Sequence, residues 1–215
     1  MPNNLESAGK LFETVEALKR SEIKRVIDGR TEQFRKIRQQ PSSELFKELC
    51  FCILCANFTA ERSMKIQNAV GDGFLNLPEK RLAQELRILG HRFPNTRAKY
   101  IVEARKYKDS LKTIVASFSD EQKLREWLIA EVKGVGPKEA SHFLRNIGCT
   151  DFAILDFHII NVLVRHGVIE KPRTITKRRY LEIEKLLKCI AQKANLNMAE
   201  LDLYLWYMET GKVLK

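Results

Sequence analysis

Lys138 is the residue of this sequence best placed for covalent chemistry. It follows a Gly-Val-Gly-Pro turn and lies in the first turn of an expected helix, where the helix dipole disfavours a charged ammonium. Partial burial would act in the same direction. A neutral amine is a competent nucleophile, so the position favours attack on an electrophilic carbon.

Asp156 is the second candidate, eighteen positions further along the chain. It ends the apolar run 152–155 and precedes an expected helix from residue 157, which is where an N-cap residue is found. An N-cap aspartate can use one oxygen for the cap and present the other to a site. The capping role and a catalytic role are therefore compatible.

The elements that position Lys138 are two helices joined by a glycine hairpin. Ser119 and Gln122 form an expected capping box for the first helix. Gly134 and Gly136 allow a tight turn, and Pro137 suits the first position of the second helix. Such a hairpin could be a purely structural corner between helices.

The backbone N–H groups of Gly134, Val135 and Gly136 could also have a binding role. Together with the positive end of the following helix dipole, they would suit a phosphate or a cation that bridges to one.

Composition limits the class of protein. The 215 residues carry a formal net charge of +11, which indicates a polyanionic partner, nucleic acid before membrane. No apolar run approaches a membrane span and the N-terminus does not begin a signal peptide, so we expect an intracellular protein. Helical periodicity with short breaks predicts an all-α fold.

Three of the five cysteines, Cys50, Cys52 and Cys55, lie on an expected helix that is apolar all round. At ~100° per residue their thiols point to different sides, so they cannot converge on one metal ion. We expect them to be core residues, and we expect neither a metal site nor a disulfide framework.

Residues 133–140, followed by 155–158, resemble the helix-hairpin-helix (HhH-GPD) DNA glycosylase superfamily, and Lys138 matches the lysine of its bifunctional glycosylase/lyase members. Residues 55–59 resemble the helix end that inserts a polar residue into the duplex, and residues 89–98 resemble the second minor-groove loop. The C-terminal stretch 206–215 resembles the compact type 2 8-oxoguanine DNA glycosylases. The similarity runs from about residue 21 to the C-terminus.

The resemblance implies a two-domain helical fold with the active site in the cleft between the domains and without the iron–sulfur cluster of some relatives. We expect residues 1–57 and 166–215 to form one discontinuous domain and residues 58–165 to form the domain that carries the hairpin. It implies no cofactor, with a monovalent cation at the hairpin left open.

The resemblance also implies roles for individual residues. Catalysis falls to Lys138 and Asp156, DNA backbone binding to Gly134, Val135 and Gly136, filling of the base gap to Asn57, Arg92 and Phe93, and lesion recognition to Trp206 and the terminal carboxylate of Lys215.

Local alternatives remain for three of these residues. Asn57 could be an ordinary helix stop, and Phe93 could be a core residue. Trp206 shares a helix face with Asp202 and Glu209, and that face could line a pocket or make a helix-packing contact.

The implied activity is excision of 8-oxoguanine from duplex DNA by lysine attack on C1′, followed by β-elimination at the abasic site, carried out by a monomer. Three alternatives stay open: a glycosylase/lyase for oxidised pyrimidines, a glycosylase that uses activated water, and a non-catalytic helix-hairpin-helix DNA-binding module. The last two have no use for Lys138.

Overall fold

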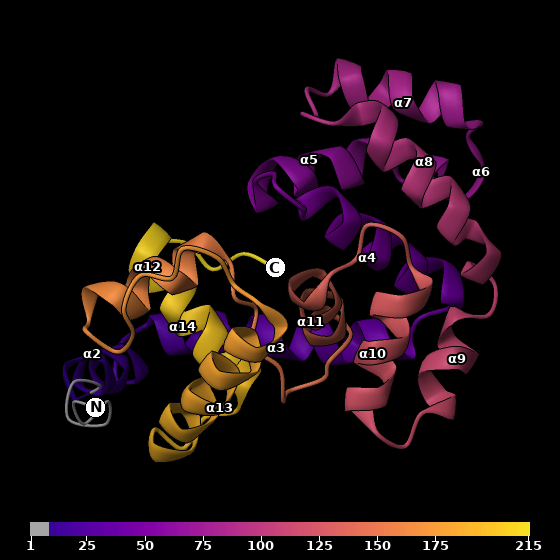
Figure 1. Ribbon diagram of the computed structural model, residues 1–215. Coiled ribbons are helices and arrows are strands. Elements are labelled where there is room, and N and C mark those ends of the chain that lie inside the picture. The colour runs from indigo at the N-terminus through magenta and orange to yellow at the C-terminus, as the bar shows by residue number, and fades with distance from the viewer. Residues whose placement is uncertain (1–8) are drawn as a thin grey trace. The chain divides into compact units, whose positions relative to one another are not determined.

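The computed structural model describes residues 9–215, which form helices joined by short loops, with no β-strand among them (Figure 1). This confirms the all-α prediction. The backbone contacts divide the chain into two compact units. Residues 34–148 form the central unit, and the described residues up to 33 form the terminal unit together with residues 149–215.

The central unit contains residues 34–39 of α3 (Ile23–Gln39), α4 (Ser42–Cys55), α5 (Ala60–Val70), α6 (Gly73–Asn76), α7 (Glu79–Ile88), α8 (Pro94–Ala104), the 3₁₀ turn η1 (Arg105–Tyr107), α9 (Leu111–Ser117), α10 (Glu121–Glu131) and α11 (Pro137–Asn146). The terminal unit contains α2 (Gly9–Lys19), residues 23–33 of α3, α12 (Phe157–Arg165), α13 (Lys177–Lys193) and α14 (Met198–Thr210).

The boundaries of the two units differ from the expected domain limits at residues 57 and 165. Helix α4 packs against α5, α6, α8, α9 and α11, so it is part of the central unit. Helix α12 packs against α14, so it is part of the terminal unit. Packing partners, which a sequence pattern does not identify, decide both assignments.

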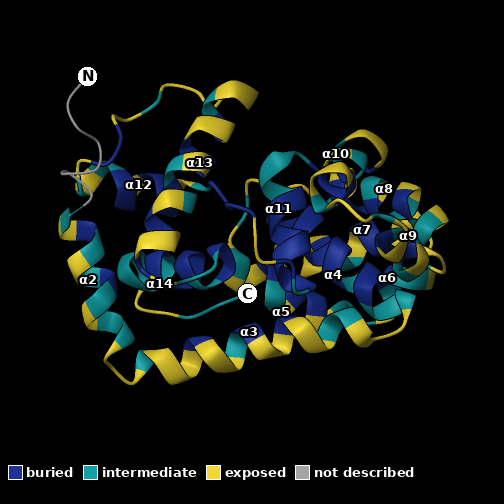
Figure 2. Ribbon diagram, turned by 90° about the horizontal axis from the view of Figure 1, so that it is seen from below, coloured by how far each residue is buried: buried dark blue, intermediate teal, exposed yellow. Residues whose placement is uncertain are grey.

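Helix α4 is the core of the central unit. Its residues 48–55 are all buried, and most of its length is dark blue in Figure 2. Cys50 and Cys52 are inaccessible to solvent and Cys55 nearly so, as expected for core residues. Burial raises the pKa of the Cys50 thiol well above its usual value, so this thiol stays protonated and unreactive.

A buried polar cluster fixes α4 relative to two neighbouring helices. The carboxylate of Glu48 accepts hydrogen bonds from Gln67 Nε2 of α5 (3.0 Å) and from Asn146 Nδ2 of α11 (3.3 Å). Buried carboxylates are stabilised by such bonds, and removing a partner is costly. The cluster therefore helps to hold α11, the helix that carries Lys138.

In the terminal unit, α13 supports the extended segment that leads to Asp156. The Tyr180 hydroxyl donates to the Ala153 carbonyl at 2.6 Å, and the Ala153 N–H donates to Glu184 Oε1 at 2.9 Å. Both backbone groups of Ala153 are thus bound to one helix. Residues 152–155 are buried, as their apolar run predicts.

Two expected element boundaries are wrong. Helix α10 is capped by Asp120 and not by Ser119, because the Asp120 carboxylate accepts the Gln122 N–H at 2.8 Å. Helix α8 begins at Pro94, inside the stretch 89–98 that resembles a minor-groove loop, so Phe93 is the last residue before that helix. Proline at the first helical position explains the earlier start.

None of the helices formed by residues 9–215 combines the length and the apolar character needed to cross a membrane.

Candidate active site

The hairpin between α10 and α11 requires glycine at position 134. Gly134 has φ +82°, a conformation that L-residues rarely adopt. A Cβ atom at this position would collide with the ring of Tyr100. The turn is therefore specified both by backbone conformation and by the aromatic ring packed against it.

Two of the three backbone N–H groups that were expected to bind a phosphate instead donate hydrogen bonds to nearby groups of the protein. The Val135 N–H donates to the Val132 carbonyl at 3.1 Å, and the Gly136 N–H donates to Glu139 Oε2 at 3.2 Å. A phosphate bound by these groups would have to displace the Glu139 carboxylate from Gly136. The N–H groups of Val135 and Gly136 are therefore already bound to acceptors of the protein itself.

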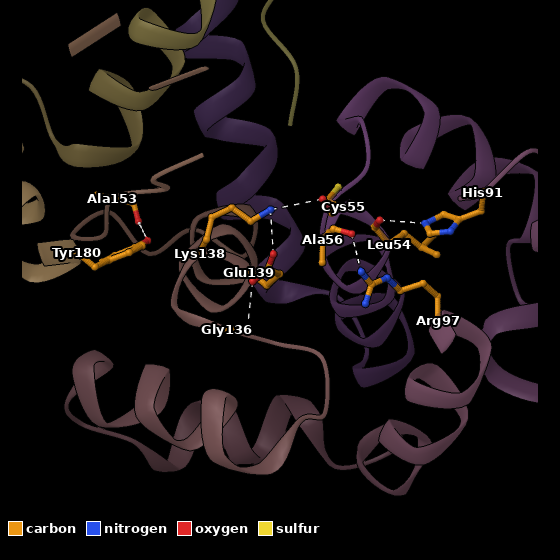
Figure 3. Close-up of polar contacts among 10 residues, drawn as sticks. All are labelled: Leu54, Cys55, Ala56, His91, Arg97, Gly136, Lys138, Glu139, Ala153 and Tyr180. Atoms are coloured by element: carbon orange, nitrogen blue, oxygen red, sulfur yellow. Dashed lines mark hydrogen bonds and ion pairs between the residues drawn. The ribbon is translucent and has the colours of Figure 1, made fainter. Parts of the chain in front are cut away.

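Lys138 lies in the first turn of α11 with its side chain 22 % exposed. Its Nζ is 2.9 Å from Glu139 Oε1 and donates to the Cys55 carbonyl at 3.4 Å (Figure 3). The amine is thus held between a carboxylate and the C-terminal end of α4. Since an ammonium has no lone pair, attack on carbon requires that this amine first lose a proton.

The C-terminal end of α4 accepts hydrogen bonds from three side chains. The carbonyls of Leu54, Cys55 and Ala56 contact His91 Nε2 (3.1 Å), Lys138 Nζ (3.4 Å) and an Arg97 guanidinium nitrogen (2.6 Å), respectively (Figure 3). The last carbonyls of a helix lack intrahelical donors and carry the negative end of its dipole. Cationic and N–H donors stabilise them, so Lys138 belongs to this cap.

Asn57 follows the cap directly and is exposed. Its φ of +56° is in the left-handed region, which asparagine adopts more readily than most residues. The structure therefore supports the helix-stop interpretation, and the exposed side chain keeps the gap-filling role open.

Arg92 and Phe93 are exposed on the loop before α8. The Arg92 guanidinium lies 5.1 Å from the centroid of the Phe93 ring, and the ring itself is 36 % exposed. The interpretation of Phe93 as a core residue is therefore wrong. An exposed aromatic next to a cation suits contact with bases and phosphates.

Asp156 is the N-cap of α12, as its position predicts. Its Oδ1 accepts the Ile159 N–H at 2.9 Å, and the residue is half-buried. The following residue, Phe157, is 65 % exposed. The carboxylate is thus fixed at the N-terminus of a helix, beside an unusually exposed aromatic.

Trp206 of α14 contacts His158 of α12 with ring centroids 4.5 Å apart, and the His158 ring is 3.8 Å from that of Phe157. Trp206 Nε1 and His158 Nδ1 are buried without a hydrogen-bond partner among the described residues. Buried polar atoms without a partner are uncommon in folded proteins. Phe157, His158 and Trp206 thus form an aromatic cluster that begins at the residue after Asp156.

The two carboxylates that share a helix face with Trp206 differ in their surroundings. Asp202 is buried, and Glu209 pairs with Arg165 and accepts a hydrogen bond from Asn161 at 3.4 Å. Glu209 thus joins α14 to α12. Lys215, the other expected lesion-recognition residue, is half-buried.

The structure places the expected site residues in both units. Lys138, the hairpin glycines, Asn57, Arg92 and Phe93 lie in the central unit, and Asp156, Trp206 and Lys215 lie in the terminal unit. No group of three or more His, Cys, Asp or Glu side chains within residues 9–215 could hold a metal ion.

The sequence did not reveal the contacts that Glu139, His91 and Arg97 make with distant or neighbouring backbone. Glu139 had a local signal, because a glutamate three residues after an N-cap often bonds back to the cap backbone. His91 and Arg97 had none, since their acceptors lie 37 and 41 residues away in sequence.

Comparison with known proteins identifies the family. A profile described as "8-oxoguanine DNA glycosylase" matches residues 27–196. This chain belongs to the 8-oxoguanine DNA glycosylase family. It is 52% identical over 206 residues to the 8-oxoguanine DNA glycosylase/AP lyase of Methanocaldococcus jannaschii. The aligned residues make up 95% of this chain and 99% of the relative.

A second relative, the 8-oxoguanine DNA glycosylase/AP lyase of Thermotoga maritima, is 44% identical over 198 residues, 91% of this chain and 95% of the relative. Solved structures of both proteins share the fold of this glycosylase. The M. jannaschii glycosylase/lyase in complex with a 15mer DNA containing 8-oxoguanine has a TM-score of 0.93 at 52% identity and covers 96% of this chain and 100% of its own. The T. maritima glycosylase has a TM-score of 0.89 at 42% identity, covering 96% and 99%.

Proposed function

We propose that this protein excises 8-oxoguanine from duplex DNA and then cleaves the strand at the abasic site. The observation that carries the proposal is Lys138, held in the first turn of α11 in a member of the 8-oxoguanine DNA glycosylase family. Relatives about half identical over nearly the full chain are bifunctional glycosylase/AP lyases. A DNA-binding module without catalysis would not need this lysine.

The reaction begins with extrusion of the damaged nucleotide, because an enzyme cannot reach C1′ of a base inside the stack. The positive net charge of +11 attracts the DNA backbone. Asn57, Arg92 and Phe93, exposed on adjoining segments of the central unit, fill the gap left by the base. Gly134, Val135 and Gly136 bind a phosphate near the site after Glu139 has released the Gly136 N–H.

Excision follows when the neutral Lys138 amine attacks C1′. The Nζ–C1′ bond forms, the glycosidic bond breaks and the base departs. Asp156, ionised, stabilises the positive charge that develops on the sugar. Trp206 and Lys215 recognise the extruded purine.

Strand cleavage follows from the same covalent intermediate. Opening of the sugar ring gives a Schiff base between Lys138 and C1′. Loss of a C2′ proton then expels the 3′ phosphate by β-elimination. These steps use side chains of the protein alone, in line with glycosylases of this type, which need no cofactor.

The test is an excision assay on four matched duplexes that carry 8-oxoguanine, thymine glycol, uracil or no lesion, with released base and strand nicks measured separately. We expect release and nicking on the 8-oxoguanine duplex alone. Activity confined to thymine glycol would keep the chemistry and overturn the substrate. Binding without release on any duplex would favour a non-catalytic module.

A further inference from the structure

His91 has no role in the reaction proposed above. It is buried, only 4% exposed, at the start of the loop that carries Arg92 and Phe93. Its ring contacts two segments that are distant in sequence. One is the loop itself, and the other is the end of α4 that leads into Asn57.

The hydrogen bonds of His91 define its tautomer. The Phe93 N–H lies 3.0 Å from Nδ1, and a backbone N–H can only donate, so Nδ1 is the acceptor. The Leu54 carbonyl lies 3.1 Å from Nε2 and can only accept, so Nε2 carries the proton. A neutral ring satisfies both bonds, whereas a protonated ring would lose the bond to Phe93.

Further contacts strengthen the same connection. The His91 ring lies against that of Phe58, the residue after Asn57, with centroids 4.3 Å apart. The buried Arg97 side chain donates to the Ala56 carbonyl at 2.6 Å, and its guanidinium is 5.8 Å from the centroid of Phe93. The residues on both sides of Asn57 are thus tied to the Arg92–Phe93 loop.

We propose that His91 is a positioning residue that joins Asn57 and the Arg92–Phe93 loop into one rigid gap-filling unit. The inference rests on the proposed function, because it assumes that these exposed residues enter the DNA. It goes beyond that function, because it states that Asn57, Arg92 and Phe93 enter the duplex together. Two independently mobile segments would each have to be ordered at the moment of base extrusion, which costs conformational entropy.

The chemistry of the His91 ring allows matched variants. In His91→Asn the amide lies near the position of Nδ1 and can still accept the Phe93 N–H. In His91→Gln the amide reaches further and can still donate to the Leu54 carbonyl. His91→Phe keeps a ring against Phe58 but makes neither bond.

The experiment is a double-variant cycle with Asn57→Ala and Phe93→Ala. Base extrusion is followed by the fluorescence of 2-aminopurine placed opposite the lesion, and excision by single-turnover kinetics. In the otherwise unchanged enzyme we expect each variant to slow extrusion about tenfold, and the double variant to be little slower than either single one. In the His91→Phe background the two effects should multiply.

The two bond-keeping variants provide the control for folding. His91→Asn and His91→Gln should each show intermediate coupling between positions 57 and 93, with unchanged affinity for undamaged duplex and single-turnover rates between those of wild type and His91→Phe. All measurements are made well below the unfolding temperature of each variant. If His91→Phe does not fold, the Asn and Gln variants alone decide the question.

The outcomes separate the two proposals. If Asn57→Ala and Phe93→Ala leave extrusion unchanged, the gap-filling function itself is wrong. If each slows extrusion but their effects multiply with His91 intact, gap filling stands and the coupling through His91 is wrong. The coupling is also wrong if it persists unchanged in His91→Phe.

Discussion

At the scale of single residues, Asp156 has a structural role and a proposed chemical role that one substitution can separate. Its Oδ1 caps α12 through the Ile159 N–H. Asparagine and aspartate are about equally good N-caps, because both offer a side-chain oxygen. The negative charge, by contrast, is what the developing cation on the sugar would need.

We therefore predict that Asp156→Asn slows excision about 10²–10³-fold, the usual cost of losing one preorganised electrostatic contact. The free energy of unfolding should change by less than about 1 kcal/mol. Single-turnover excision and thermal unfolding measure the two quantities. Asp120→Asn is the matched control, since Asp120 caps α10 through the Gln122 N–H, and its excision rate should be unaffected. Equal activity of Asp156→Asn and wild type would disprove the electrostatic role.

Glu139 makes two contacts with different oxygens. Oε1 pairs with Lys138 Nζ at 2.9 Å, and Oε2 accepts the Gly136 N–H at 3.2 Å. Glutamine has one carboxamide oxygen, so Glu139→Gln can keep only one of these contacts. Alanine keeps neither.

We predict that Glu139→Gln lowers the single-turnover rate about tenfold and that Glu139→Ala lowers it further. The reason is that Glu139 holds the amine in its attacking position, and a contact that contributes ~1.4 kcal/mol in the transition state corresponds to a factor of ten in rate. Rates at saturating enzyme separate this effect from DNA affinity. Wild-type rates in both variants would show that Glu139 does not position the amine.

At the scale of elements, the glycines of the hairpin and of α3 give opposite predictions. Gly134→Ala places a Cβ in a left-handed conformation and against Tyr100, so we expect a loss of at least about 1–2 kcal/mol from the conformation alone. Gly29→Ala, exposed in the middle of α3 with no atom near the new Cβ, should gain about 0.5–1 kcal/mol. Denaturant unfolding at one temperature compares them. A neutral Gly134→Ala would contradict the described turn.

The loop before α8 gives a prediction about pH. Burial lowers the pKa of His91, and the nearby Arg97 charge adds to this, while the bond to the Leu54 carbonyl opposes it. Below about pH 6.5, the ordinary histidine value, the unfolded chain therefore binds a proton that the folded chain does not. Stability should rise with pH in this range and fall as the pH drops below it.

His91→Gln removes this titration and should flatten the acidic limb of the stability curve measured from pH 7 to pH 5. The free energy of unfolding of this variant near neutral pH measures the effect of the lost contacts separately from the titration. An unchanged pH dependence in this variant would show that His91 does not titrate as its buried position requires.

At the scale of the whole molecule, local sequence signals and long-range contacts account for different parts of the site. The cap by Asp156, the start of α11 at Pro137 and the left-handed turn at Gly134 follow from short-range rules about caps and glycine, and all were predictable. The all-α fold followed from helical periodicity for the same reason.

The cap on α4 was not predictable, because it depends on tertiary packing. Lys138 and its acceptor Cys55 are 83 residues apart in sequence, and no local pattern relates them. The same is true of His91 and Arg97 with their acceptors. Residues close in space but distant in sequence thus decide how the expected nucleophile and the expected gap-filling residues are held.

Lys138 is proposed to form the covalent intermediate with DNA. Sodium borohydride trapping on a duplex containing 8-oxoguanine tests this role, because borohydride reduces a Schiff base to a stable amine. Lys138→Gln is compared with Lys133→Gln, which removes an exposed lysine that pairs with Glu103. We predict that wild type and Lys133→Gln give a covalent protein–DNA complex and that Lys138→Gln gives none while still binding the duplex. A trapped complex with Lys138→Gln would contradict the account, since another amine would then be the nucleophile.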